Sequence, residues 1–352
     1  MFALIGAVLP QEGAMTAHAI AMWQRAHPIL TKPLRPLGFF RIFHSWGFLV
    51  TVVLLAVNTL TCTILSMSGK TTHSSGLATS RRSKRIGFLV LHVSIVVLLA
   101  GAFVSAGTRL DGFILLTEGQ KFAEEHDGYR RIAEGPLRHE RHNGFELLLE
   151  SVRKEYDSGH LIGITSTFEI THRNGKTISK QVAVNRPLMV DGLSFTQDET
   201  GFSPRIIIRD KRSGEIRLNS FVALKTFRTK EGREYRDFLP LPLLGSRVIV
   251  TLYPSFAMKN GEARKTGEQV TNPLLVIETE DESGRTIETG HLELGGEAMV
   301  GGFSFRFEDL RHWSSFKVVD DPGYPVVCVA LCLAIIGLIT RYSGDLRDWH
   351  RE

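Results

Sequence analysis

Long stretches without any charged side chain interrupt an otherwise polar chain. Residues 45–69, 86–108 and 323–340 contain no Asp, Glu, Lys or Arg. A helix rises about 1.5 Å per residue, so about 20 residues cross the roughly 30 Å hydrocarbon core of a bilayer. The first two stretches are too long for a soluble domain of this size to bury, and the third is near the lower limit of a span. The pattern predicts three transmembrane helices.

A different pattern fills residues 109–322. Asn174-Gly175 is typical of a type I′ hairpin, because both residues tolerate positive φ. No stretch of this region shows a sustained apolar helical period, so we predict a large, mainly antiparallel β domain, either a sandwich or an irregular barrel. The charged, glycine-containing residues 109–143 are interpreted as a connection from the membrane to the sheet. The short runs rich in β-branched residues lie at 165–170, 205–209, 246–252, 272–279 and 302–307.

Basic residues between the first two spans set the predicted orientation. Lys70, Arg81, Arg82, Lys84 and Arg85 stand there without any acidic residue, and short basic loops face the cytoplasm. Anionic lipid head groups are a sufficient partner for these side chains, so the net charge of +5 does not indicate a nucleic-acid site. We predict a multi-pass protein of the inner (cytoplasmic) membrane whose large domain is extracytoplasmic.

The predicted organisation follows from these spans. The N-terminal apolar run, residues 2–9, is too short to cross a bilayer and lacks the basic start of a signal peptide. We interpret it as the end of a first membrane helix whose beginning is missing. The predicted parts are this remnant with an extracytoplasmic loop at 1–44, a transmembrane helix at 45–67, a basic cytoplasmic loop at 68–85, a transmembrane helix at 86–108, the extracytoplasmic β-rich domain at 109–322, a transmembrane helix at 323–340 and a cytoplasmic tail at 341–352.

Signatures of catalysis are missing from the sequence. It contains no glycine-rich phosphate loop, no Cys-x-x-Cys, no His-Glu-x-x-His and no Gly-x-Ser-x-Gly. It also lacks Cys-x-x-Cys-His, so the chain does not itself carry covalently bound c-type haem. Cys62, Cys328 and Cys332 fall inside predicted spans and are interpreted as small apolar residues. We therefore predict no catalytic residue.

One histidine lies inside a long span. His92 is surrounded by the apolar sequence of residues 88–95, where an ionisable side chain is expensive and is by default a functional candidate. It follows Arg85 by seven residues, or about 10 Å along a helix. A neutral imidazole can bind iron axially, as in haem proteins. It can equally hydrogen-bond to a neighbouring helix, and position and chemistry alone do not separate the two interpretations.

The remaining histidines give weaker signals. His44 and His312 stand near the ends of spans and are interpreted as interfacial neighbours rather than ligands. Histidines of the outer region, such as His139, His142 and His160, show no spacing typical of a metal site.

Several segments together resemble the ResB-like proteins of the system II cytochrome c biogenesis pathway. Each segment is short, but their order and spacing extend over nearly the whole chain. The family has four spans, whereas this chain has three and the remnant at 2–9. The segments are Leu9-Pro10-Gln11, His44-Ser45-Trp46-Gly-Phe48 leading to Val57-Asn58-Thr-Leu-Thr-Cys62-Thr63, Gly87-Phe88-Leu-Val-Leu-His92 with Leu99-Ala-Gly101, Gly112 through Glu118-Gly119, Val184-Asn185-Arg-Pro187-Leu188 with Gly192 and Gln197, and Asp321-Pro322-Gly323-Tyr-Pro325.

The resemblance implies a subunit of a membrane complex that delivers haem b for covalent attachment to apocytochrome c. The implied partners are a CcsA-like membrane protein, apocytochrome c, haem itself and the lipid bilayer. In fused family members the histidine matching His92 pairs with a partner histidine to ligate haem within the membrane. His92 is accordingly expected to bind the haem iron axially, while the ligation chemistry is expected to need the partner, so that the chain alone is not an enzyme.

A different class of protein remains as the alternative. A membrane-anchored β domain acting as a scaffold or sensor would need no haem, and His92 would then be a packed polar residue of a helix bundle.

Overall fold

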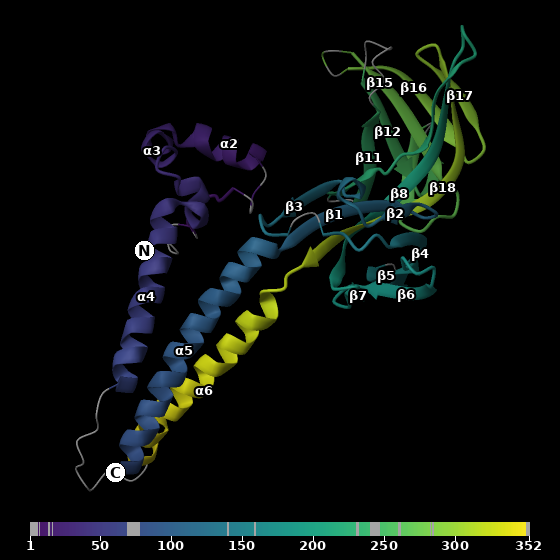
Figure 1. The fold of residues 1–352 in the computed structure, drawn as a ribbon. Coiled ribbons are helices and arrows are strands. Elements are labelled where there is room, and N and C mark those ends of the chain that lie inside the picture. Colours follow the sequence, from purple (N-terminus) through teal and green to yellow (C-terminus); the bar gives the residue numbers. More distant parts are fainter. Residues whose placement is uncertain are drawn as a thin grey trace. The chain divides into compact units, whose positions relative to one another are not determined.

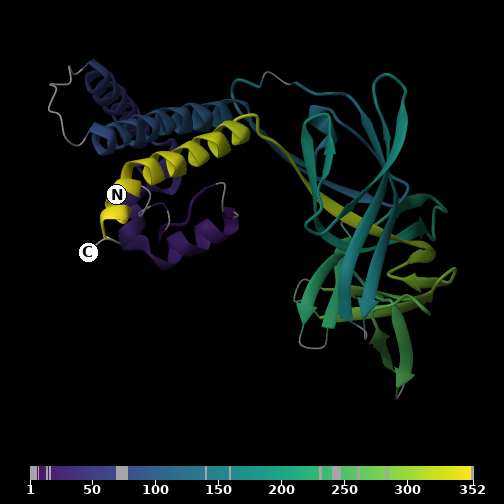
Figure 2. The ribbon, with the colours of Figure 1, turned by 90° about the horizontal axis from the view of Figure 1, so that it is seen from below.

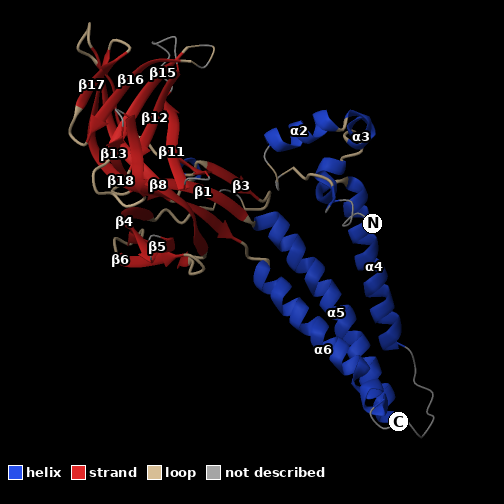
Figure 3. Ribbon diagram, turned by 180° about the vertical axis from the view of Figure 1, so that it is seen from behind, coloured by secondary structure: helices blue, strands red, loops and turns tan. Residues whose placement is uncertain are grey.

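The computed structural model contains a helical unit and a β-rich unit. Contacts divide the chain into Met1–Thr108 with Asp321–Glu352, and Arg109–Asp320. The predicted fold class, apolar helices with a large antiparallel β domain, is confirmed, and the domain forms no closed barrel (Figures 1 and 3). The residues that the structure describes are 6, 8–12, 15, 17–68, 78–138, 141–157, 160–229, 232–239, 247–259, 262–281, 283 and 285–349.

Three helices are long and apolar enough to cross a membrane. Their apolar windows are Trp46–Leu65, Ser83–Thr108 and Tyr324–Ser343. Large apolar side chains such as Val53, Phe103 and Ile339 are exposed along them, as expected for surfaces that meet lipid or another membrane protein. The helices of this unit are α2 (Ala17–Ala26), α3 (Pro28–Leu34), the 3₁₀ helix η1 (Phe39–His44), α4 (Trp46–Ser68), α5 (Ala78–Thr108) and α6 (Tyr324–Trp349).

The helices α5 and α6 extend beyond their uncharged stretches. Arg81, Arg82, Lys84 and Arg85, expected in a loop, lie on the first turns of α5, and Lys70 lies outside the described residues. Nothing in residues 78–85 breaks a helix: the segment contains neither proline nor glycine. At the same end of the pair, α6 continues past Thr340 to Trp349.

Small residues at seven-residue intervals bring α5 and α6 together. The helices lie side by side (Figure 2). A Cβ added to Gly87 would lie 2.4 Å from the backbone nitrogen of Arg341, and one added at Gly323 would lie 2.4 Å from the carbonyl oxygen of Gly101. Backbones this close leave no room for side chains. The residues are Gly87, Ser94 and Gly101 in α5, and Gly323, Ala330 and Gly337 in or just before α6.

Asp321 fixes the beginning of α6 to α5. Its Oδ1 accepts hydrogen bonds from the backbone N–H groups of Gly323 and Tyr324, at 3.1 and 3.2 Å. Its Oδ2 accepts one from the Ser105 hydroxyl of α5 at 2.9 Å. A carboxylate at this position satisfies N–H groups that the helix cannot pair and favours the positive end of the helix dipole.

The β-rich unit is built from four antiparallel sheets. Seven strands form the largest, in the order β3-β1-β18-β8-β7 with β17 beside β18 and β9 beside β8; the others are β10-β11-β12-β15-β16, β2-β4-β5-β6 and β13-β14. The strands are β1 (Leu110–Thr117), β2 (Lys121–Ala123), β3 (Arg131–Glu134), β4 (Glu146–Asp157), β5 (His160–Thr171), β6 (Thr177–Ala183), β7 (Leu188–Val190), β8 (Leu193–Asp210), β9 (Ile216–Phe221), β10 (Lys225–Thr229), β11 (Gly232–Leu239), β12 (Arg247–Tyr253), β13 (Ser255–Lys259), β14 (Glu262–Gly267), β15 (Leu274–Glu280), β16 (Thr286–Glu293), β17 (Glu297–Val300) and β18 (Phe303–Asp320).

Two details of the sequence interpretation were wrong. Residues 109–143 are not a plain connection, because β1 pairs with both β18 and β3 inside the largest sheet. The buried positions of β1 alternate, but the charged residues around this strand hide the alternation in the sequence.

The turn at Asn174-Gly175 does join β5 to β6, yet only Gly175 has a positive φ, of 80°. The Asn174 carboxamide oxygen accepts a bond from the Lys176 backbone N–H, so the turn is not type I′.

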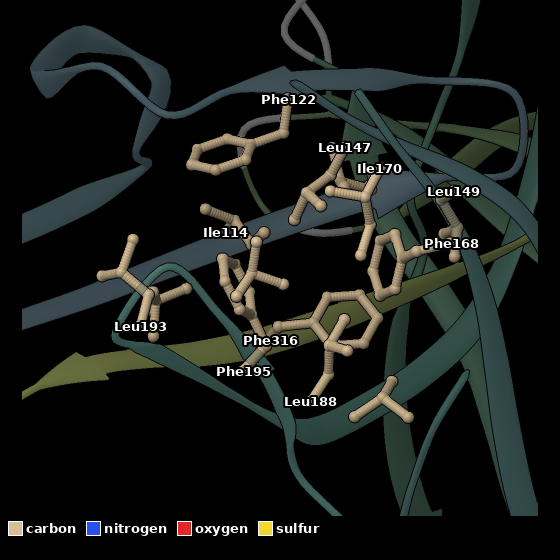
Figure 4. Packing of buried hydrophobic residues seen from close by; sticks show 14 of the residues in the cluster. Ile114, Phe122, Leu147, Leu149, Phe168, Ile170, Leu188, Leu193, Phe195 and Phe316 are labelled. Atoms are coloured by element: carbon tan, nitrogen blue, oxygen red, sulfur yellow. The ribbon is translucent and has the colours of Figure 1, made fainter. Parts of the chain in front are cut away.

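The two longest strands, β8 and β18, run through two hydrophobic cores. In the first core, aromatic rings of Phe122, Phe168, Phe195 and Phe316 pack among aliphatic side chains of β1, β4, β5, β6, β7, β8 and β18 (Figure 4). The second core collects apolar residues of β8, β11, β12, β15 and β18 together with Leu292 and Val300. Because each long strand contributes to both cores, the cores cannot move independently without breaking the β8–β18 pairing.

A polar belt separates the cores where these strands cross between them. Gln197 donates to the Ser314 hydroxyl at 3.0 Å, and Thr117 donates to Ser203 at 3.0 Å, all of them buried. Trp313 lies over Gly201, where a Cβ would be 2.5 Å from the indole nitrogen. Buried polar groups are tolerated here because they pair with one another.

A buried lysine faces the second core. The ammonium of Lys154 in β4 lies 4.1 Å from the ring centre of Phe202 and 5.9 Å from that of Tyr235, and no hydrogen bond within the described residues reaches its Nζ. Burial, with a smaller effect from the Arg233 charge, lowers the pKa of Lys154 to about 7. Burial therefore outweighs the attraction of the two aromatic faces for the charged form.

Lys154 should make the stability of the β-rich unit depend on pH. Between pH 7 and 10.5 the unfolded chain holds a proton on Lys154 that the folded chain has released, so this group makes the free energy of unfolding rise with pH. Lys154→Met should stabilise the unit by about 1–3 kcal/mol at pH 6 and progressively less toward pH 10. Thermal unfolding of both proteins across this range measures the effect. Exposed Lys225→Met is the control, and equal pH slopes in all three proteins would refute the assignment.

The close helix contact should not tolerate a side chain at Gly101. A Cβ there would lie 3.0 Å from the backbone nitrogen of Val327, so Gly101→Val should separate α5 from α6 and weaken the helical unit by about 1–3 kcal/mol. Ala102→Val, at an exposed neighbouring position, is the matched control. The measurement is the maleimide labelling rate of half-buried Cys328, resolved from the other cysteines by mass spectrometry. Unchanged labelling in Gly101→Val would show that the helices do not need this contact.

Candidate functional site

His92 is positioned by its own helix. Its Nδ1 lies 3.0 Å from the carbonyl oxygen of Phe88, one turn earlier in α5. A carbonyl oxygen only accepts hydrogen bonds, so Nδ1 carries the proton and donates it. In the neutral imidazole the lone pair is then on Nε2. A second contact fixes the ring, since the centres of the Phe88 and His92 rings are 3.8 Å apart.

The Nε2 atom of His92 remains available. Within the described residues it makes no hydrogen bond, and the side chain is only half-buried. His92 follows Gly87 by five residues, so it lies about 140° around the helix from the line of contact with α6. The neighbouring-helix hydrogen bond considered from the sequence is therefore absent from the described part of the protein.

A basic side chain from α6 also contacts the Phe88 ring. The guanidinium carbon of Arg341 is 5.5 Å from the Phe88 ring centre, and its Nη1 donates to the Lys84 carbonyl oxygen at 3.4 Å. Taken with the ring contact of His92, these distances put the guanidinium within roughly 9 Å of the imidazole centre. The site thus combines a nitrogen ligand, apolar surface and a positive charge.

Sequence reasoning identified His92 but missed Arg341 as its companion. Arg341 is the first residue of the predicted cytoplasmic tail, residues 341–352, for which no contact with His92 was expected. The seven-residue spacing of small residues on both helices was the available signal, because an antiparallel pair in register at Gly87 and Gly337 brings residue 341 beside Gly87.

The other candidate residues lie elsewhere. His312, predicted near the end of a span, is within β18 of the β-rich unit, where its backbone N–H donates to Glu118 at 2.9 Å and its ring centre lies 5.0 Å from that of Phe202. The backbone of His44 ends η1, while His139 and the side chains of His44 and His160 lie outside what is described. Cys62, Cys328 and Cys332 are free thiols.

Glu118 links three strands of the outer domain. Its carboxylate accepts backbone hydrogen bonds from Val152 of β4 at 2.6 Å and from His312 of β18 at 2.9 Å. Burial alone would raise the pKa of the Glu118 carboxyl, but the hydrogen bonds from His312 and Val152 hold it below its ordinary value. At the next position Gly119 has a φ of 84°, and a Cβ there would lie 2.5 Å from the Arg311 guanidinium. This segment is therefore structural.

The segment from Val184 to Gln197 has a structural explanation as well. Asn185 adopts a φ of 60°, and Asp191 and Gly192 have φ values of 46° and 89° in the turn between β7 and β8. Asn, Asp and Gly are the residues that adopt this region most readily. Gln197 belongs to the polar belt between the cores. None of these residues is placed as a ligand.

Comparison with known proteins finds one family over nearly the whole chain. The profile of the ResB-like family matches residues 1–69 and 65–351. A relative called cytochrome c biogenesis protein Ccs1, from Rhodomonas salina, is 20% identical over 99% of this chain and 85% of its own length. One called cytochrome c biogenesis protein CcsB, from Trichormus variabilis, is 20% identical over 99% of this chain and 81% of its own.

These matches extend over the helical unit and the β-rich unit alike, and the names of the relatives place them in cytochrome c biogenesis. With three apolar helices of membrane-spanning length and an antiparallel β-rich unit between the second and third, the chain is a membrane protein that belongs to the ResB-like family.

Proposed function

We propose that this chain is the haem-handling subunit of a system II cytochrome c biogenesis complex. It holds haem b in the membrane through His92 and helps to deliver it for covalent attachment to apocytochrome c. Membership of the ResB-like family and the names of the relatives support the pathway. The haem step rests on the chemistry of the chain itself.

The state of His92 is the observation that carries this proposal. Its Nδ1 proton is engaged by the Phe88 carbonyl oxygen at 3.0 Å, while Nε2 has no partner among the described residues. A backbone hydrogen bond of this kind orients metal-binding imidazoles and increases the basicity of the other nitrogen. The ring can thus bind iron through Nε2. An ionisable side chain inside a span is expensive and is by default functional, and the His92 side chain is half-exposed.

The surroundings of His92 suit a flat, apolar macrocycle with two carboxylate arms. Leu89 and Val96, three residues before and four after His92, share its face of α5 and are half-buried. They would lie along the porphyrin. The Arg341 guanidinium, within roughly 9 Å of the imidazole centre, would pair with a propionate, because an arginine binds a carboxylate with two parallel hydrogen bonds.

The orientation of the chain supports haem entry from the cytoplasmic side. The antiparallel register brings Arg341 of α6 beside Lys84 of α5, so the basic residues of both helices gather at one end of the pair. Such an end faces the cytoplasm. Residue 92 is then about 10 Å inside that face, and the chain leaves the other end at Thr108 and returns at Asp321, which makes the β-rich unit extracytoplasmic.

The chain offers one axial ligand and a CcsA-like membrane protein is the proposed source of the other. His92 is the single histidine in the three apolar windows, whereas haem iron in transfer proteins is commonly held from both faces of the ring. The partner also supplies the chemistry of thioether formation, for which this sequence has no recognisable catalytic group.

Replacing His92 by glycine should remove haem in a way that free imidazole reverses. The full chain, expressed with its CcsA-like partner and purified in detergent, should show a Soret band. His92→Gly should lower the haem per chain by roughly tenfold or more, as expected for loss of a ligand when outer-sphere partners alone are worth 10–100-fold. Millimolar imidazole should restore much of the band, because it fills the space of the missing ring.

A glycine at the next position controls for damage to the helix. Val93 is exposed on α5, so Val93→Gly adds the same helix-weakening residue without touching the ligand, and imidazole should change nothing there. Equal haem content in His92→Gly and wild type would contradict the proposal. So would the absence of haem from the wild-type complex combined with normal cytochrome c maturation in a His92→Ala strain, which would indicate an anchored scaffold.

A further inference from the structure

Three side chains that are distant in the sequence pattern meet in the β-rich unit. His126 lies on the 3₁₀ helix η2 (His126–Gly128), Glu134 ends β3, and His142 precedes β4. One ligand atom from each lies within 4.8 Å of the others. The Nδ1 atom of His126 is 3.0 Å from Oε2 of Glu134, and Nε2 of His142 is 3.7 Å from Oε1 of the same carboxylate.

A second carboxylate orients His142. Glu124 has no exposed surface, and its Oε1 lies 2.8 Å from Nδ1 of His142. The same oxygen accepts a bond from the Tyr129 hydroxyl at 3.0 Å. Its Oε2 accepts bonds from the backbone N–H groups of Asn143 and Gly144. A carboxylate oxygen only accepts hydrogen bonds, so Nδ1 of His142 carries the proton and donates it to Glu124. In the neutral ring the lone pair is then on Nε2.

The lone pair of His142 points into the cluster without a hydrogen bond. The His142 side chain is 10% exposed, and Nε2 has no hydrogen-bond partner in the part of the chain that the structure describes. Oε1 of Glu134, on a side chain 13% exposed, is likewise without a hydrogen bond. Buried nitrogen and oxygen acceptors that face each other repel, unless a cation lies between them.

The distances suit a small divalent ion. Zinc binds histidine nitrogen and carboxylate oxygen at about 2.0–2.2 Å, which in a tetrahedron separates two ligand atoms by about 3.3 Å. The observed nitrogen–oxygen separations of 3.0 and 3.7 Å bracket this value. The His126 side chain is 53% exposed, so a shift of its ring can close the wider gap between the two imidazoles.

The charge of the cluster also favours a cation. Arg138 lies 3.2 Å from Glu134 and 2.7 Å from Asp320. Together with the buried Glu124, which contacts His142, the group holds three carboxylates and one guanidinium, which leaves two negative charges when both imidazoles are neutral. Arg138 would compete with a metal ion for Oε1 of Glu134, but the Nε atom of Arg138 is not aligned to hydrogen-bond to that oxygen. The other oxygen of Glu134, Oε2, is directed to His126. A doubly charged ion would balance the group.

We propose that His126, Glu134 and His142 bind a divalent transition metal of the zinc type, with Glu124 as the outer carboxylate that orients His142. Two neutral imidazoles and a carboxylate are ligands typical of such ions rather than of magnesium or calcium. The exposed side at His126 leaves a fourth position for water or a further ligand. The ion would join η2, β3 and the segment before β4 into one rigid corner. This site is independent of haem binding at His92.

Cobalt(II) is a suitable probe, because it replaces zinc and absorbs in the visible range when four-coordinate. The full chain carrying His92→Gly, which keeps haem absorption out of that range, is stripped with a chelator in detergent and titrated with cobalt(II), then with zinc. We expect one equivalent of cobalt bound with visible bands, displaced by one equivalent of zinc. His126→Ala should abolish the bands, and Glu124→Gln should weaken binding by roughly 10–100-fold.

A second histidine–carboxylate pair provides the matched control. His172 lies 3.1 Å from Asp191 on the exposed surface, and neither belongs to a third-ligand cluster among the described residues. His172→Ala should therefore leave the titration unchanged. Since His126 is exposed, His126→Ala should fold normally, as circular dichroism can confirm. No cobalt or zinc bound at tens of micromolar, or binding that survives His126→Ala, would overturn the proposal.

Discussion

The close contact of α5 with α6 is the constraint on which the helical unit depends. Glycine at Gly87, Gly101, Gly323 and Gly337 allows two backbones to touch, and in a bilayer such contact replaces the hydrophobic effect as the force that joins helices. The contact occupies one face of α5 completely. Any group that must remain accessible on this helix therefore has to lie on another face, and His92 does. The same spacing of small residues that packs α5 against α6 therefore keeps His92 on a different face of α5.

The β-rich unit depends on two long strands in a similar way. The strands β8 and β18 pair over most of their length and supply residues to both hydrophobic cores. The polar belt between the cores fixes the register of the strands, because a shifted strand would lose the buried bonds of Thr117 to Ser203 and of Gln197 to Ser314. The domain that results is one body, in which Glu118 and the turns at Asn185 and Gly192 stabilise strand junctions and do not bind ligands.

The sequence predicts the large features of this protein well, for physical reasons. Uncharged runs of membrane length have few alternatives to being spans, and β-branched runs between turns produced strands in each of the five predicted places. β1 was missed because charged residues around this strand hide its alternation of buried positions. The type of the turn at Asn174 was missed because its side chain accepts a hydrogen bond from the Lys176 backbone N–H, and Asn174 does not adopt the positive φ that a type I′ turn needs. The proximity of Arg341 to His92, and of His126 to Glu134 and His142, depends on tertiary register. No local pattern encodes such proximity. For Arg341 and His92, the equal seven-residue spacing of small residues on the two helices was the available signal.

The proposed function gives the single imidazole of His92 a further consequence. A resident haem is usually held by ligands and a pocket from the same chain, which makes release slow. Here the three apolar windows contain one histidine, on a face of α5 that the described chain leaves half-exposed. Such a site would hold haem firmly only while a second protein supplies the other axial ligand and covers the ring. Separation of the two proteins, or rotation of one helix against the other, would then weaken both axial bonds together. Under the proposed function, the incomplete site therefore suits transfer of haem better than storage, and the affinity of the chain for haem would be a property of the complex.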